Sequence, residues 1–290
     1  MRVCVQCDAT FPAGWRCPAC AYTPDEVDGR LQFAPNFESG VGGFDPEAFD
    51  RLAEVEGDHF WFESRNQLIA WAIARYFPDA SSLLETGCGT GFVLAGIERA
   101  FPNLTLWGGE PYADGLAQAA RRTRCATLVQ MDARQIPFEG EFDVVGAFDV
   151  LEHIEEDELV LERMHRAVVP GGGIVLTVPQ HAFLWSAVDE KAHHVRRYSA
   201  PDLATKIRRA GFQVARVTSF MSIMLPLMVL SRMRTRARLR ADDGLAELRI
   251  GGVANASAAC VLSLERLLIR SGISFPAGGS LLAVARKGHS

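Results

Sequence analysis

The chain is 290 residues long, with 48% hydrophobic residues, 22% charged residues, a net charge of −5 and a pI near 5.8. This composition is typical of a globular protein with one large domain and appendages, or with two domains. The acidic balance disfavours nucleic acid as the main partner, because nucleic-acid binders usually carry a basic face. We find neither an apolar N-terminal leader nor a run of eighteen apolar residues, and therefore expect a cytoplasmic protein.

Four of the seven cysteines form two C-x-x-C pairs near the N-terminus: Cys4 with Cys7, and Cys17 with Cys20. Four thiolates at this spacing can close a tetrahedral zinc site that leaves no open position for chemistry. An iron site with the same ligands and four unrelated reduced thiols are the alternatives. We expect a zinc ribbon over residues 1–22 that staples the terminus or contacts protein, since it carries few basic residues, Arg2 and Arg16.

Two helices are expected after this ribbon. Residues 23–44 contain prolines and glycines without periodicity, which indicates a linker. Asp45-Pro-Glu then starts a helix that runs to about Gly57, and a second helix follows from Asp58 to Phe77. Apolar side chains of the second helix fall on one face and are expected in the core, among them Phe62, Ile69 and Ile73.

A glycine-rich stretch organises the rest of the chain, Ser81-Ser-Leu-Leu-Glu-Thr-Gly-Cys-Gly-Thr-Gly-Phe-Val-Leu94. It predicts a strand, a ligand-binding loop and a helix, because Gly87, Gly89 and Gly91 let the backbone turn tightly and lie against a ligand. The dinucleotide fingerprint G-x-G-x-x-G fails on spacing, since Phe92 and Leu94 stand where its third glycine would be. The pattern is E-x-G-x-G-x-G.

Further strands alternate with helices beyond this loop, which predicts a mostly parallel sheet with helices on both faces. The expected strands are residues 104–110, 126–132, 142–148, 174–178, 212–218 and 279–286. Counting the strand before the glycine loop as the first, each of the first three strands has an acidic residue at its end, in the order Glu85, Glu110 and Asp132. A carboxylate after the second strand can accept both ribose hydroxyl hydrogens of a nucleoside held on the preceding loop. Glu110 is therefore the expected ribose ligand.

This glycine loop, followed by acidic strand ends in this order, resembles the first motifs of the class I S-adenosylmethionine-dependent methyltransferases, over roughly residues 58–290. The resemblance implies a seven-stranded, doubly wound α/β methyltransferase sheet whose last strand is antiparallel. It also implies an enzyme that binds S-adenosylmethionine, with Asp132 at the adenine amino group and Asp149–Ile154 beside the transferred methyl. The cofactor-binding residues that it implies are Glu85, Gly87, Cys88, Gly89, Gly91, Glu110, Pro111, Asp132, Ala133 and Asp149.

The same resemblance suggests a division of the chain. His59–Phe62 with Arg65 and Asn66 is similar to a pattern before the first strand in a bacterial subset of the family, where it covers the cofactor; simple packing is the alternative. The expected parts are the ribbon 1–22, a linker 23–44, cofactor-covering helices 45–80, a cofactor-binding core 81–220, a helical insertion 221–278 and the last strand 279–290.

The chemistry implied is in-line displacement at a sulfonium methyl, for which the protein aligns the acceptor and removes its proton. A hydroxyl acceptor needs a base, and the candidates are His153, His193 and His194, with Glu152 orienting His153. The stretch Asp149-Val-Leu-Glu-His153 is similar to the E-x-x-E-H of ubiquinone-pathway O-methyltransferases and small-RNA 2′-O-methyltransferases, where such residues hold a divalent ion. Two alternatives follow: a metal-free acid/base pair, and a divalent metal on Asp149, Glu152 and His153 completed by His193 or His194.

The expected insertion before the last strand carries no strand signal. Residues 221–233 are mostly apolar, five arginines occupy alternate positions from Arg232 to Arg240, and a second helix is expected near 254–271. One interpretation is a helical lid over the acceptor pocket that favours an apolar substrate. The other is peripheral contact of residues 221–240 with an anionic membrane, since thirteen apolar residues are too few to span one.

The function expected from these features is S-adenosylmethionine-dependent methyl transfer to a small, apolar or lipid-linked acceptor, at a hydroxyl. A zinc-ribbon RNA methyltransferase, a sugar C- or N-methyltransferase and a non-catalytic binding module that kept the fold are the alternatives. The acidic pI weighs against RNA, and the intact glycine loop with its acidic residues weighs against a non-catalytic module. Quinone-like phenols, sugars on a carrier lipid and secondary metabolites all stay open as acceptors.

Overall fold

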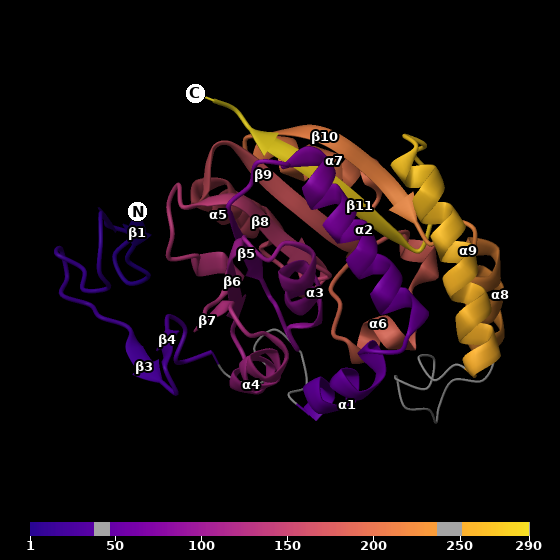
Figure 1. Cartoon of the computed structure of the whole chain (residues 1–290), viewed down its shortest axis with the longest axis horizontal. Helices are drawn as coiled ribbons and strands as arrows, with labels where there is room; N and C mark the ends of the chain where they lie inside the picture. Colours follow the sequence, from indigo (N-terminus) through magenta and orange to yellow (C-terminus); the bar gives the residue numbers. More distant parts are fainter. Residues whose placement is uncertain (38–46, 237–250, 290) are drawn as a thin grey trace.

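The computed structural model describes residues 1–37, 47–236 and 251–289. Nine strands form one mixed sheet in the order β10-β11-β9-β8-β5-β6-β7-β4-β3, and helices cover both of its faces (Figure 1). A separate two-stranded hairpin, β1 (Arg2–Val3) and β2 (Thr10–Phe11), lies at the N-terminal end.

Seven of the nine strands make up the sheet that the sequence predicts. They are β5 (Ser82–Thr86), β6 (Thr105–Glu110), β7 (Thr127–Gln130), β8 (Phe142–Phe148), β9 (Val168–Pro179), β10 (Phe212–Phe220) and β11 (Ser280–Lys287). Strands β5 to β9 pair in parallel, whereas β11 pairs antiparallel with both β9 and β10. The α/β methyltransferase fold with an antiparallel last strand is therefore confirmed.

Apolar residues on both sides of the central strands explain why helices cover both faces. Neighbouring residues such as Val144 and Val145 of β8 point to opposite faces and belong to two separate core clusters. One cluster includes side chains of α2 (Phe60–Tyr76), α3 (Phe92–Ala100), α4 (Ala113–Arg122) and α9 (Gly252–Arg270). The other includes α5 (Asp157–Ala167) and α7 (Ala200–Arg209).

Strand β9 is longer than the predicted strand 174–178, because it begins at Val168 and runs through Gly171, Gly172 and Gly173. A Cβ on Gly172 would lie 2.4 Å from the Asp143 carbonyl oxygen, and one on Gly173 would lie 2.1 Å from that of Ala285. These glycines therefore allow β9 to approach its two neighbouring strands closely.

The segment that we expected to be an unstructured linker contains a hairpin, β3 (Asp25–Val27) and β4 (Arg30–Gln32). Strand β4 lies next to β7 and extends the main sheet. The turn residues Asp28 and Gly29 have φ angles of 51° and 74°, which is the conformation that an Asp-Gly pair favours in a two-residue hairpin. This turn signal was present in the sequence and went unused. Residues 38–46 of the expected linker and helix start lie outside the described residues.

The N-terminal ribbon docks against the edge of the main domain. The backbone N–H of Val3 donates to the Pro137 carbonyl at 3.0 Å, and the terminal amine lies 2.9 Å from a Glu141 oxygen. Phe138, which is fully buried, contacts the Trp15 ring, with 5.8 Å between the ring centroids. The ribbon is thus part of the folded body, at the left-hand end of the molecule in Figure 1.

The remaining elements lie near the carboxyl ends of the strands or form the insertion. The former are α1 (Glu47–Glu56), α6 (Ala187–Lys191) and the short 3-10 turns η1 (Ala133–Gln135), η2 (Leu151–His153) and η3 (Ala182–Leu184). The insertion consists of α8 (Leu225–Arg236) and α9, with residues 237–250 between them outside the described residues. Helix α9 packs along α2, so the insertion contacts the helix that precedes the glycine loop.

Candidate active site

The glycine loop between β5 and α3 adopts the tight turn that its spacing predicts. Gly87, Gly89 and Gly91 all have positive φ angles, of 70°, 52° and 74°. A Cβ on Gly87 would lie 2.6 Å from a Val150 methyl group, and one on Gly91 would lie 2.7 Å from the Ala119 Cα. The two outer glycines therefore permit close packing. Among the described residues, only the Phe49 ring lies within 4 Å of the corresponding position on Gly89. The middle glycine faces α1.

Glu110, the expected ribose ligand, lies at the end of β6 with its carboxylate turned toward the loop. One oxygen accepts the Gly89 N–H at 2.9 Å, and the other accepts the Tyr112 N–H at 3.2 Å. Burial raises the pKa of this carboxyl to about 7, although both N–H donors act to lower it. The Phe49 ring of α1 lies 5.9 Å from the Tyr112 ring, so α1 covers this part of the site.

Glu85 lies at the inner end of β5 and is almost completely buried. Within the described residues, its Oε2 has no hydrogen-bond partner. Burial raises its pKa well above the ordinary range; Glu110 and Glu56 add to this, and Arg65 opposes it. A buried carboxylate oxygen without a partner beside a glycine loop suits a ligand that brings its own cationic or N–H donor. S-adenosylmethionine carries an ammonium group, so the donor set fits this cofactor.

The expected adenine contacts lie one strand further on. Asp132 caps η1 by accepting the Arg134 N–H at 2.9 Å, and the same arginine side chain forms an ion pair with it at 2.8 Å. Ala133 beside it is buried. Pro111 contributes its carbonyl to the Gln130 side-chain amide at 3.0 Å, and buried Cys88 donates its N–H to the Gly109 carbonyl at 3.0 Å.

Asp149 takes a position that the sequence analysis did not anticipate. It has a left-handed backbone with a φ of 57°, and its carboxylate pairs with the buried Arg65 of α2. The Thr177 hydroxyl donates to the same carboxylate at 3.2 Å. The Arg65 guanidinium also lies 4.5 Å from the centre of the Trp61 ring. Asp149 thus connects the end of β8 to the helix that precedes the glycine loop.

Glu152, His153 and His194 form a compact group beside Asp149. Their potential ligand atoms lie within 4.8 Å of one another, and the two imidazole rings are 4.7 Å apart and nearly perpendicular. Asp149 is not a member of this group, because the η2 turn begins after it and its carboxylate faces Arg65. His193, the other loop histidine considered, is exposed and also lies outside it.

Burial controls the charge of this group. It raises the pKa of the Glu152 carboxyl well above its ordinary range, and the charge of Asp149 adds to the effect. It lowers the pKa of His153 to about 3, with His194 lowering it further, so this imidazole is neutral at neutral pH. Neither carboxylate oxygen of Glu152 has a hydrogen-bond partner among the residues that the structure describes. Among the described residues, no hydrogen bond therefore connects Glu152 to His153, the residue that it orients in the acid/base interpretation.

A network of side chains holds the loop that carries His194. Asp189 is completely buried and bonds His194 Nδ1 at 2.9 Å and Arg197 at 2.7 Å. The Arg197 side chain holds the pKa of Asp189 below its ordinary value together with His194, although burial opposes them. The adjacent backbone is tied to η2, since the Val195 N–H donates to the Glu152 carbonyl at 2.7 Å.

A second anchor lies three residues further along this loop. The Tyr198 hydroxyl is 2.6 Å from an Asp157 carboxylate oxygen and 3.2 Å from the Leu151 carbonyl. Lys206 and Arg196 pair with the same carboxylate at 2.6 and 2.7 Å. Residues about 40 positions apart are therefore clamped together around the Glu152 group.

The structure also adds two kinds of site residue that the sequence analysis missed. Arg65 was part of a motif before the first strand, but we did not assign it to the site; its position as the one arginine in that motif was the available signal. Asp189 and Arg197 lie in the same loop as His194 and were given no role. Nothing in the local pattern predicts that they hold His194, because the contact depends on how the loop folds.

The four N-terminal cysteines come together at the other end of the molecule. Their sulfur atoms lie within 4.8 Å of one another, with Cys4 and Cys20 at 3.6 Å and Cys7 and Cys17 at 3.6 Å. Tetrahedral coordination at the usual Zn–S distance of about 2.3 Å requires sulfur atoms roughly 3.8 Å apart. The cluster therefore fits a zinc ion held by four thiolates.

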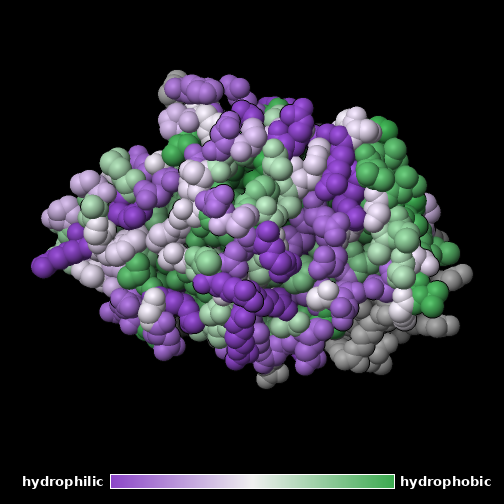
Figure 2. Space-filling view, in the orientation of Figure 1, coloured by the Kyte–Doolittle hydropathy of each residue, from purple (hydrophilic) through white to green (hydrophobic). Residues whose placement is uncertain are grey.

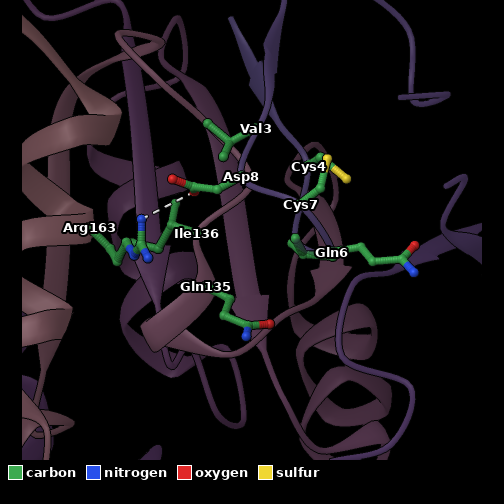
Figure 3. Close-up of a pocket in the computed structure, with 9 residues that line it drawn as sticks. Val3, Cys4, Gln6, Cys7, Asp8, Gln135, Ile136 and Arg163 are labelled. Carbon is green, nitrogen blue, oxygen red and sulfur yellow. Dashed lines mark hydrogen bonds and ion pairs between the residues drawn. The ribbon is translucent and has the colours of Figure 1, made fainter. Parts of the chain in front are cut away.

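A cavity of about 140 Å³ lies between this ribbon and the main domain (Figure 3). Gln6 and Asp8 line it on the ribbon side, and Gln135, Ile136 and Arg163 line it on the other. Arg163 pairs with Asp8 at 3.3 Å, as the dashed line shows. The lining includes no residue of the glycine loop or of the Glu152 group, so the cavity is separate from the candidate active site.

The class I S-adenosylmethionine-dependent methyltransferases are defined by three features that this structure has. They are a doubly wound sheet with an antiparallel last strand, a glycine loop after the first core strand and an acid at the end of the next strand. The comparison with protein families agrees. A family model described as "Methyltransferase domain" matches residues 56–217, which is more than half of the chain. The chain belongs to this family and is an S-adenosylmethionine-dependent methyltransferase.

Curated relatives differ in what they methylate. The chain is 26% identical over 166 residues to "Ubiquinone biosynthesis O-methyltransferase" of Pseudomonas aeruginosa (strain UCBPP-PA14), covering 50% of this chain and 70% of that protein. It is 32% identical over 134 residues to "dTDP-3-amino-3,6-dideoxy-alpha-D-glucopyranose N,N-dimethyltransferase" of Streptomyces fradiae. That match covers 45% of this chain and spans only 51% of the relative.

A solved structure shows the same fold. The Haemonchus contortus phosphoethanolamine N-methyltransferase 2, in complex with S-adenosyl-L-methionine, superposes with a TM-score of 0.56 over 86% of this chain. The match covers 59% of that protein, and the sequence identity is 17%, so the likeness concerns the fold alone.

Proposed function

We propose that this methyltransferase transfers a methyl group to a hydroxyl of a small, apolar acceptor. The observation that carries the proposal is the buried group of Glu152, His153 and His194, which lies beside Asp149 at the carboxyl end of β8. The carboxyl ends of parallel strands are where such sheets bind their substrates. Glu85, Glu110 and Asp132 hold the cofactor beside this group, and a hydroxyl brought to it meets the neutral imidazole of His153 with the His194 ring next to it.

The charge of the group favours a divalent cation over a metal-free base. An imidazole whose pKa is lowered to about 3 is a weak base for a phenolic hydroxyl, whose pKa is about 10. The same neutral imidazole, together with an unpartnered carboxylate and a second histidine, has the composition of a divalent metal site. Glu152, His153 and His194 would hold the ion, which would lower the pKa of the acceptor hydroxyl.

Exhaustive chelation distinguishes these two forms of the mechanism. We expect turnover to be lost after EDTA treatment and restored by Mg²⁺ or Mn²⁺, with cofactor affinity unchanged by calorimetry. The ribbon metal has to be measured in the same sample by elemental analysis, because only retention of the ribbon zinc assigns the loss to the Glu152 group. Full activity in a treated sample that kept its ribbon zinc would leave His153 as a metal-free base.

The small-molecule acceptor is supported by the relatives, whose names describe ubiquinone biosynthesis and a nucleotide-linked amino sugar. The ribbon offers little to RNA, because Arg2 already pairs with Glu141 at 2.9 Å and lies over the Trp15 ring. A gel-shift with total RNA tests the alternative of an RNA methyltransferase. We expect no shifted band at physiological salt. A shifted RNA band under these conditions would contradict the proposal.

Methylation of a sugar nitrogen is the second candidate, and the 32% identity to the Streptomyces fradiae N,N-dimethyltransferase favours it. An amine acceptor that arrives unprotonated is already a nucleophile, so it does not need the activation that a hydroxyl acceptor needs. Assays with paired phenol and amino-sugar acceptors therefore separate the two functions. Turnover of the amine that survives His153→Ala would support N-methylation.

We propose further that the four cysteines hold one structural zinc. The support is their sulfur geometry and their distance from the candidate active site. Elemental analysis of protein purified without chelator is expected to give about one zinc per chain, and Cys17→Ser is expected to abolish it. The exposed Cys125→Ser is the matched control and should keep the metal. Iron in place of zinc, or no metal at all, would overturn this assignment.

A further inference from the structure

The insertion presents an apolar surface that nothing else in the described structure covers. We call it the outer face of α8 and α9, and it comprises Ile223, Leu227, Leu230, Val253, Leu264 and Leu267. Between 42% and 85% of the surface of each of these residues is exposed. Figure 2 shows this face as the green area at the right-hand side of the molecule, where Figure 1 places α8 and α9.

The spacing of these residues gives α9 a continuous exposed stripe, and in α8 Leu227 and Leu230 lie about one turn apart. In α9, Val253, Cys260, Leu264 and Leu267 follow helical spacing on the exposed side. Its opposite side, with Ala258, Leu262 and Ile269, is buried and packs toward α2. The helix is therefore apolar on both sides, although only one side has a partner among the described residues. A contiguous exposed face of this kind marks an interaction surface.

The sequence of the insertion also carries a run of positive charge. Residues 221–241 contain arginines at positions 232, 234, 236, 238 and 240 and no acidic residue at all. In α9 the only acidic residue, Glu265, is buried and accepts the Ile223 N–H at 2.8 Å, whereas Arg270 at the end of the helix is exposed. A segment whose sequence combines an exposed apolar stripe with a run of arginines has the composition that suits the interface of a membrane with anionic lipids.

We propose that the outer face of α8 and α9 lies on the surface of an anionic lipid bilayer. Helix α9 is long and apolar enough to cross a membrane by length and composition. It lies on the surface rather than spanning it, because its buried Glu265 bonds to the backbone before α8 and its Arg266 bonds to Ser64 of α2. A second copy of the chain fits less well, since it would bring together two copies of a segment that carries five arginines and no acidic residue.

The same surface lies next to the elements that surround the candidate active site. Arg232 of α8 bonds to the Ser186 hydroxyl, which begins the loop that carries His194. Asn255 of α9 accepts the Phe60 N–H at 2.9 Å and donates to the Asp58 carbonyl at 2.7 Å, at the start of α2. Membrane contact would thus bring the acceptor side of the site toward the bilayer. An apolar acceptor could then enter the site from the bilayer, a step that rests on the proposed function.

Vesicle flotation of the full chain tests the proposal. We expect the protein to float with phosphatidylcholine vesicles that contain phosphatidylglycerol, and less with phosphatidylcholine alone. Leu264→Glu with Leu267→Glu should lower binding to the anionic vesicles at least about tenfold. Arg234→Gln and Arg236→Gln should each lower it about fivefold, with no effect on neutral vesicles. Val27→Glu, at an exposed apolar residue of β3 at the opposite edge of the sheet, is the matched control and should float like the wild type.

Two results would overturn the proposal. One is a wild-type protein that stays soluble with both kinds of vesicle. The other is self-association in analytical ultracentrifugation that the Leu264→Glu and Leu267→Glu substitutions abolish, with vesicle binding unchanged, because a second copy would then cover this face. Calorimetry with S-adenosylmethionine on the same samples separates the two proposals. All variants should keep the wild-type affinity, and failure to bind the cofactor would contradict the proposed function but not the flotation result.

Discussion

The two sides of the candidate active site are built in different ways. On the cofactor side, backbone groups make most of the contacts between neighbouring strands and their loops. Gly87 and Cys88 donate to the Gly109 carbonyl at 2.7 and 3.0 Å, and the Gly89 N–H donates to the Glu110 carboxylate. On the acceptor side, side chains join segments far apart in the sequence. The Asp189 and Asp157 networks hold the loop of residues 189–198 against η2.

This difference separates two kinds of expected effect. The cofactor side is set by backbone conformation, so a single side-chain change there should weaken cofactor affinity and leave the loop in place. The acceptor side depends on buried charged groups, and changes there should lower turnover while cofactor affinity stays constant. Substitutions that affected both properties equally would show that the two sides are not independent.

The largest effect is expected from His153→Ala on the acceptor side. Loss of this imidazole removes either the base or a metal ligand, so turnover should fall about 10²–10⁴-fold with the cofactor Kd unchanged. Steady-state kinetics and calorimetry on the same sample measure both quantities. His289→Ala, at an exposed histidine near the C-terminus, is the control and should behave like the wild type. Normal turnover by His153→Ala would remove the group from the mechanism.

The two sides also differ in how much could be predicted from the sequence. The glycine loop and the strand ends that carry Glu110 and Asp132 could be placed because each depends on a local pattern of apolar residues, glycines and one acid. Their roles as ligands stay predictions. By contrast, the choice of His194 over His193 depends on Asp189, which reaches His194 only after the loop has folded against η2. No local pattern carries that information.

Two departures from the expected fold have different causes. The β3–β4 hairpin could have been predicted, since Asp28 and Gly29 between short strands are a common turn signal. The position of Asp149 could not, because its partner is far away in the sequence and no local pattern indicates the contact. The structure instead gives it a left-handed backbone, and a buried arginine from α2, 84 residues away, binds it.

A smaller effect is expected from Glu110→Ala on the cofactor side. The loss of hydrogen bonds from the ribose hydroxyls to a buried carboxylate should weaken S-adenosylmethionine binding by about 1–3 kcal/mol. Turnover at saturating cofactor should change much less, which is the opposite pattern to His153→Ala. Calorimetry gives the affinity, and Glu139→Ala at the ribbon junction is a control carboxylate outside the site. An unchanged Kd would exclude Glu110 as the ribose ligand.

The pH dependence of cofactor binding also tests whether Glu110 is the ribose ligand. Burial raises the folded-state pKa of Glu110 to about 7, so a growing fraction of the free protein is protonated below that pH. The ribose hydroxyls donate to the ionised form, and the affinity should therefore rise with pH through about 7 and level off above it. Below that pKa, the Kd should increase by up to about tenfold per pH unit. Glu110→Gln should flatten this profile, and a wild-type profile without a step near 7 would contradict the assignment.

The smallest effect is expected from Tyr198→Phe, which tests whether the acceptor loop is held by side chains. The substitution removes a hydroxyl that lies 2.6 Å from Asp157 and 3.2 Å from the Leu151 carbonyl, while Lys206 and Arg196 still pair with Asp157. The free energy of unfolding should fall by about 1–3 kcal/mol, and turnover should fall several-fold because His194 is held less firmly beside His153. Tyr76→Phe, at the end of α2 near the amino end of β5, is the matched control. Because the cofactor side does not use this anchor, the Kd for S-adenosylmethionine should stay at the wild-type value. A parallel loss of cofactor affinity would show that the acceptor loop and the glycine turn are structurally coupled.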